Sequence, residues 1–125
     1  MRREVITTDK IAPPVGPFAA GVRESGLIFL SGQIALAPST GKLIEGDVTQ
    51  QATQVLKNIE AVLNAAGRTF ADVVKATVFL LDMKDFGAVN KAYEARFEAP
   101  YPARTAVAVA ALPLGALVEI EVIAR

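Results

Sequence analysis

The 125-residue sequence contains neither cysteine nor histidine. It therefore has no thiol nucleophile, no histidine-based catalytic triad and no ordinary zinc site. If the protein catalyses a reaction, an Asp or Glu is the natural proton carrier and an Arg the natural anion ligand. Without cysteine no disulfide forms, so the default expectation is a cytoplasmic protein.

An excess of charge is also missing, because 13 Lys and Arg balance 13 Asp and Glu. Proteins that bind nucleic acid or anionic membranes usually carry a basic patch, so neither partner is expected. No apolar run approaches the ~20 residues of a membrane span. With 52% hydrophobic residues, the chain is expected to fold as a single domain over residues 1–125.

What is present is a clear pattern of apolar residues. The helical spacing that starts after Asp47 and stops at Gly67 predicts a helix with an N-cap and a glycine stop. The continuous apolar run 73–81 predicts a strand buried on both faces. The full set comprises strands at 3–8, 19–23 and 27–33, a helix at 47–66, a strand at 73–81, a helix at 85–97, and strands at 103–111 and 117–124.

The order β-β-β-α-β-α-β-β favours an α+β fold with both helices on one face of one sheet. In the strand at 103–111, alternate residues point to opposite faces, and apart from Arg104 neither face looks solvated. Two helices cover only one face of a sheet. We therefore expect the second face to be buried against other copies of the chain.

Three charged residues stand in the apolar strands near the C-terminus. Arg104 is interpreted as an ion-pair partner of Glu119 or Glu121, as a side chain that extends to solvent at a strand end, or as a guanidinium that holds a ligand carboxylate or phosphate. The two glutamates share one side of their strand, where they either face water at an edge or exchange protons with a substrate. Asn90 in the second helix is interpreted as solvent-facing or as a site residue.

These residues stand in motifs that resemble the reactive intermediate deaminase family, also called the RidA or YjgF type. The similarity covers about residues 12–124, and its most specific part is Pro-Ala-Arg followed by Val-Glu-Ile-Glu. The matching segments are 14–18, 30–34, 46–47, 54–63, 66–67, 74–80, 86–90, 102–104, 111–113 and 118–121.

The resemblance implies a chorismate-mutase-like fold with one mixed sheet, assembled as a barrel-like homotrimer with clefts between subunits. It also implies a hydrolytic deaminase of 2-imino acids and enamines, such as 2-iminobutanoate and 2-iminopropanoate, that forms the 2-oxo acid and ammonia. The expected partner is a small carboxylate metabolite, and no cofactor or metal is expected.

Site roles follow from the same resemblance. Arg104 matches the arginine that binds the substrate carboxylate, and Glu119 matches the residue that activates water. These two are the expected catalytic residues. The expected substrate-binding residues are Phe18, Ser31, Gly32, Asn90, Arg104 and Ala106, of which Ala106 would contribute its backbone.

One motif departs from the family pattern. The usual Gly-Pro-Tyr-Ser-Gln is here Gly-Pro-Phe-Ala-Ala at residues 16–20, so Phe18 keeps the ring but lacks the hydroxyl. We expect slower turnover or an altered substrate. Alternatives are deamination of a related acid such as 2-aminomuconate, a carboxylate-binding protective module without turnover, and an RNA-related activity, which the balanced charge disfavours.

Overall fold

The computed structural model describes residues 3–125 and contains the expected order of elements. Three short 3-10 helices, which the sequence patterns did not predict, precede β4, α2 and β6. The elements are β1 (Glu4–Ile6), β2 (Gly21–Glu24), β3 (Leu27–Leu30), α1 (Val48–Ala65), η1 (Phe70–Asp72), β4 (Val73–Leu80), η2 (Met83–Asp85), α2 (Phe86–Glu94), β5 (Ala103–Ala108), η3 (Pro113–Gly115) and β6 (Val118–Ala124).

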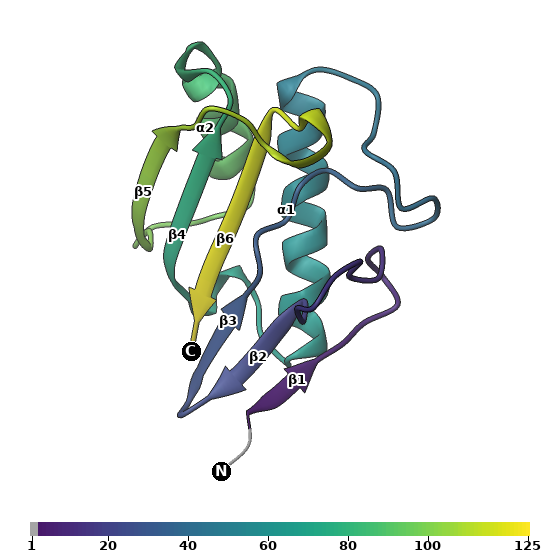
Figure 1. Cartoon of the computed structure of the whole chain (residues 1–125). Coiled ribbons are helices and arrows are strands. Elements are labelled where there is room, and N and C mark those ends of the chain that lie inside the picture. The colour runs from purple at the N-terminus through teal and green to yellow at the C-terminus, as the bar shows by residue number, and fades with distance from the viewer. Residues whose placement is uncertain (1–2) are drawn as a thin grey trace.

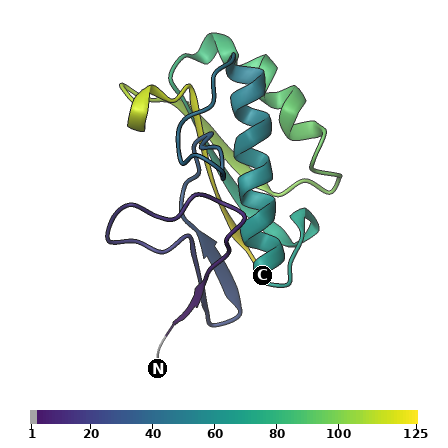
Figure 2. The same cartoon turned by 90° about the vertical axis from the view of Figure 1, so that its right-hand side faces the viewer.

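One mixed six-stranded sheet organises the molecule, in the order β1-β2-β3-β6-β4-β5. Only β4 and β5 are parallel, because α2 connects them, and the other neighbours are antiparallel. Both α-helices lie on one side of the sheet, and within residues 3–125 the other side carries no α-helix (Figures 1 and 2). The predicted α+β fold, with both helices on one face of one mixed sheet, is therefore confirmed.

Local chemistry explains where two of these elements begin and turn. The Asp47 side chain accepts from the Gln50 backbone N–H at 3.0 Å, and the Gln50 side chain accepts from the Asp47 N–H at 2.9 Å. This capping box begins α1. Between β2 and β3, Ser25 and Gly26 have φ of 51° and 80°. Positive φ at both central residues suits a two-residue hairpin turn.

The core lies between α1 and the helix-covered face of the sheet. Alternate residues of β4 and β6 point into it, so each of these strands has one fully buried face. The largest apolar side chains with less than 2% exposure are Ile28, Val55, Leu56, Ile59, Val62, Leu63, Val78, Leu80, Val118, Ile120 and Val122.

Two buried polar residues of α1 bind loops on the sheet side. The Asn58 amide donates to the carbonyls of Ile34 at 3.3 Å and Leu36 at 3.1 Å. The Gln51 side-chain oxygen accepts from the Leu117 N–H at 2.9 Å. Because Gln51 and Asn58 are two helical turns apart, one face of α1 holds both loops.

The predicted ends of several elements were wrong. The strand expected at 103–111 ends at Ala108, because its partner β4 ends at Leu80. The strand expected at 27–33 ends at Leu30, and the helix expected at 85–97 ends at Glu94. The strand at 73–81 is fully buried on one face only, since its other face is half-buried in this chain.

Candidate active site

Glu119 lies on the helix-free face of β6, in the middle of the sheet. It pairs across the sheet with Phe79 of β4 and is half-buried. Burial raises the pKa of its carboxyl above the ordinary value, and the neighbouring Glu121 charge raises it further. A carboxyl with a raised pKa is a stronger proton acceptor than an ordinary carboxyl, which suits a general acid–base residue.

Gly32 makes room for this carboxylate. A Cβ built on Gly32 would overlap Oε2 of Glu119 and lie 3.0 Å from its Cδ. Only the bare Cα of a glycine therefore permits the observed side-chain position. The sequence analysis expects Gly32 to bind substrate, which stays a prediction; the structure places it against the Glu119 carboxyl.

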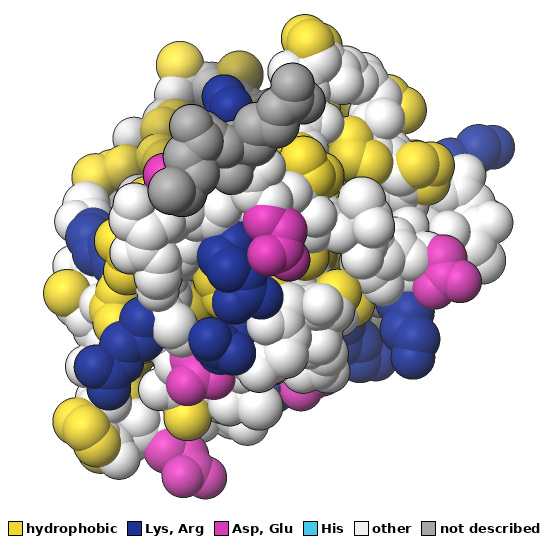
Figure 3. Space-filling view, turned by 90° about the horizontal axis from the view of Figure 1, so that it is seen from below, with side chains coloured by type: hydrophobic (Ala, Val, Ile, Leu, Met, Phe, Trp, Pro, Cys, Tyr) yellow, Lys and Arg dark blue, Asp and Glu magenta, His cyan; other side chains and the backbone are white. Residues whose placement is uncertain are grey.

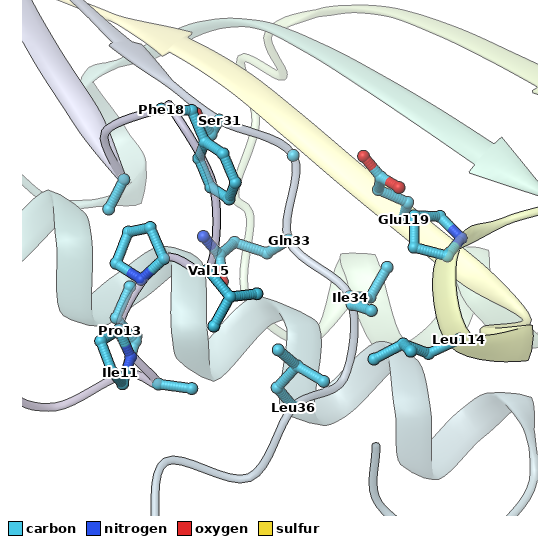
Figure 4. Close-up of a pocket in the computed structure, with 15 residues that line it drawn as sticks. Ile11, Pro13, Val15, Phe18, Ser31, Gln33, Ile34, Leu36, Leu114 and Glu119 are labelled. Carbon is cyan, nitrogen blue, oxygen red and sulfur yellow. The ribbon is translucent and has the colours of Figure 1, made fainter. Parts of the chain in front are cut away.

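The carboxylate of Glu119 borders a pocket of about 510 Å³ with mostly apolar walls. Figure 4 shows Val15, Ile34, Leu36 and Leu114 arranged around this space, with Phe18 and Ser31 at its other end. The loop before β2 and the turn η3 build two of its walls, and both project on the helix-free side (Figure 2). Phe18 is 53% exposed in the single chain, so its ring is available to a ligand.

The Ser31 side chain makes a hydrogen bond within the chain. Its hydroxyl donates to the Ala19 carbonyl at 2.6 Å, which joins the strand end to the Phe18 loop. The hydroxyl oxygen retains the capacity to accept a hydrogen bond. The apolar wall residues Val15, Ile34 and Leu114 were not predicted from the sequence, because isolated apolar residues in loops carry no periodic signal.

Arg104 lies elsewhere, on the edge strand β5. Its guanidinium carbon is 4.9 Å from the centroid of the Tyr93 ring and 5.6 Å from that of Phe86. With Asn90 and Tyr93 it lines a smaller cavity of about 280 Å³. Ala106 lies on the same face of β5, where it is half-buried and packs against the core.

The predicted site residues thus form two groups on opposite faces of the sheet. Arg104 pairs with Ala76 of β4, whereas Glu119 pairs with Phe79 of the same strand. Positions 76 and 79 differ by an odd number, so they point to opposite faces. Phe18, Ser31, Gly32 and Glu119 form one group; Asn90, Arg104 and Ala106 form the other.

This register excludes two of the alternatives left open by the sequence. Within the chain, Arg104 does not pair with Glu119 or Glu121, which lie on the opposite face. Nor do the glutamates stand at an edge, because β6 is flanked by β3 and β4. Among residues 3–125, no group of three acidic side chains lies close enough to hold a metal ion.

The comparisons with known proteins agree with this architecture. The family model described as endoribonuclease L-PSP matches residues 8–125. A mouse protein named 2-iminobutanoate/2-iminopropanoate deaminase is 49% identical over 122 residues, which cover 98% of this chain and 90% of the mouse protein.

Two crystal structures superpose closely on this chain. RidA from an Antarctic Psychrobacter species has a TM-score of 0.94 and 45% identity, with 98% of this chain and 99% of that chain covered. Escherichia coli TdcF with bound serine has a TM-score of 0.92 and 40% identity, with 97% of each chain covered.

These matches define a small-metabolite deaminase domain. The chain belongs to the endoribonuclease L-PSP family, that of the reactive intermediate deaminases, and the resemblance found in the sequence is confirmed. In the described part of the chain, 3–125, no helix has the length and apolar character needed to cross a bilayer.

Proposed function

We propose that the protein hydrolyses reactive 2-imino acids and enamines, of the 2-iminobutanoate and 2-iminopropanoate type, to 2-oxo acids and ammonia. The main support is the half-buried Glu119, whose raised pKa and position over an apolar pocket suit proton transfer to and from a small substrate. The mouse relative's name points to the same reaction.

The proposed reaction needs two side chains. The Arg104 guanidinium binds the substrate carboxylate through two parallel N–H donors, which orients the adjacent C=N carbon. Glu119 accepts a proton from water as the water oxygen forms a bond to the carbon of the protonated imine, whose C=N electron pair moves to the nitrogen. Glu119 then returns that proton to the amine nitrogen. Ammonia leaves as the C–N bond breaks, and the hydroxyl proton passes to solvent as the new C=O forms.

The two side chains meet only if the site lies between subunits. Because Arg104 and Glu119 are on opposite faces within one chain, we propose a homotrimer in which each cleft takes Arg104 from one copy and Glu119 from another. The helix-free face of the sheet supports this assembly. Val5, Leu27, Phe29 and Val107 on that face are each 37% or more exposed in the single chain.

A mixing experiment tests the shared cleft. R104A and E119Q should each be inactive, while co-refolding them in equal amounts should restore about a quarter of the wild-type sites. In a mixed trimer, an E119Q copy supplies Arg104 and an R104A copy supplies Glu119 to one intact cleft. Failure to restore any activity, with mixed trimers demonstrated by mass spectrometry, would refute the shared cleft.

The deaminase reaction itself is tested with a coupled assay. An amino-acid oxidase generates imines from different amino acids, and semicarbazide traps the imine that remains. The protein should lower the trapped adduct. If wild-type protein never lowers it for any amino acid, deamination of imines is excluded. If the wild-type protein then still bound 2-oxobutanoate, the alternative of a carboxylate-binding module without turnover would be favoured.

Two further assignments belong to this proposal. We place the protein in the cytoplasm, because a chain without cysteine needs no oxidising compartment; fractionation of the source cells tests this. We also propose that RNA is not a substrate. On the face in Figure 3, basic and acidic side chains are interspersed rather than gathered into a basic stripe. Salt-sensitive RNA binding by pure protein would contradict this.

A further inference from the structure

Arg104 has no acidic partner among the described residues. The ion pairs in residues 3–125 join Arg23 to Glu4 at 3.4 Å and Arg96 to Glu60 at 3.0 Å. Arg104 instead lies over two aromatic rings of α2, Phe86 and Tyr93, within the distance at which a cation is attracted to a ring face. An aromatic ring holds a guanidinium without neutralising its charge.

The Tyr93 ring is itself held rigidly. It is only 4% exposed and stacks on Phe97 with centroids 4.1 Å apart and planes at 16°. Phe97 in turn contacts Phe70 edge-on, with centroids 4.8 Å apart. Because the stack is anchored in the core, Tyr93 is unable to turn away from β5. An exposed arginine on an edge strand would otherwise lose much rotamer freedom on binding a ligand.

The hydroxyl of Tyr93 adds a second observation. Its oxygen is buried and has no hydrogen-bond partner among the described residues. Burial raises the pKa of Tyr93, an effect that the nearby Arg104 charge partly offsets. The side chain is therefore a neutral phenol near pH 7, and it interacts with Arg104 through its ring face rather than as a phenolate.

We propose that Tyr93 is a positioning residue, whose core-anchored ring holds the Arg104 guanidinium so that its N–H groups remain available to an incoming carboxylate. Phe86 provides a second ring, whose centroid is 5.6 Å from the guanidinium carbon. The identity of the ligand rests on the proposed function, whereas the immobilisation of Arg104 does not. The ring, and not the hydroxyl, is responsible for this effect.

The test compares Y93F and Y93L with F97L, which loosens the anchor of Tyr93 but leaves its ring beside Arg104 and should therefore raise Kd less than Y93L does. Both leucine variants remove one ring from the same buried stack, but only Tyr93 contacts Arg104. NMR relaxation of the Arg104 Nε–H reports its mobility, and calorimetry reports the Kd for 2-oxobutanoate. We expect Y93L to mobilise Arg104 and to raise Kd and KM about tenfold with a smaller change in kcat. Y93F should stay within about twofold of wild type.

The outcomes separate this inference from the proposed function. An immobile Arg104 in Y93L, or equal weakening of binding by F97L, would overturn the positioning role. A mobile Arg104 in the wild type would overturn it as well. If the wild-type protein binds no carboxylate but Arg104 becomes mobile only in Y93L, the proposed function is refuted and the positioning role of Tyr93 is supported. If Y93L does not fold, F86L removes the half-buried ring and should mobilise Arg104 less strongly.

Discussion

Replacing Gly32 with alanine should inactivate the enzyme without unfolding it. The added Cβ would overlap Oε2 of Glu119 and lie 3.2 Å from its Cγ, so the carboxyl side chain has to move. The backbone does not resist the change, because the φ of Gly32 lies outside the left-handed region that favours glycine. The perturbation therefore acts on the position of one side chain.

The expected magnitude follows from that geometry. Misplacing a catalytic group by about 1 Å costs roughly 100-fold in rate, and a general acid–base residue contributes about 10²–10⁴-fold. We expect kcat/KM of G32A to fall about 100-fold, and this loss should not exceed the loss in E119Q. The half-buried Glu119 is free to turn toward solvent, so the free energy of unfolding should change by less than about 1 kcal/mol.

The coupled imine assay and thermal unfolding measure these two effects. Gly87 provides a matched control, because a Cβ there meets no atom within 4 Å. G87A lies in α2, should keep full activity and should stabilise the helix by about 1 kcal/mol. Full activity in G32A, with a crystal structure showing Glu119 in its original position, would refute the argument. So would an equal loss of activity in G87A.

Three other changes test the site. Burial raises the pKa of Glu119, so the folded protein loses stability as the pH rises from the ordinary carboxyl pKa through the raised one. E119Q should therefore raise Tm at about pH 7.5 but not at about pH 3.5; an equal shift in Tm at the two pH values would contradict this. R104K should weaken 2-oxobutanoate binding about 10–100-fold in calorimetry, because lysine lacks the paired donors; unchanged Kd would argue against Arg104 as the carboxylate ligand. The apolar pocket predicts that imines from leucine are hydrolysed with up to about 60-fold higher kcat/KM than those from alanine, since burial of the three additional carbons contributes about 0.8 kcal/mol each; equal values in the coupled assay would exclude a role for the pocket in substrate choice.

Much of the fold follows from the sequence because periodicity reports which side of an element is buried. The helix after Asp47 and the alternation at Val118, Ile120 and Val122 are both found as predicted. Element ends were harder, because pairing partners decide them. Phe97 stays buried although it lies outside α2, since stacking on Tyr93 holds it there.

The site was predictable only in its parts. Alternation within a strand gives the relative orientation of Glu119 and Glu121, but it does not give the register between strands. The register of β4 with β5 and β6 is what puts Arg104 and Glu119 on opposite faces. Likewise, the spacing of Tyr93 and Arg104 in the sequence does not indicate that the Tyr93 ring lies against the Arg104 guanidinium.

The hydrogen bonds from Asn58 to the carbonyls of Ile34 and Leu36 have an evolutionary consequence. They fasten the pocket wall to the core through its backbone, so the side chains at positions 34 and 36 do not hold the wall in place. Substitutions of these two side chains should therefore be tolerated by the fold. Relatives with this fold would be able to acquire new substrates through substitutions at positions 34 and 36, while the fold is retained.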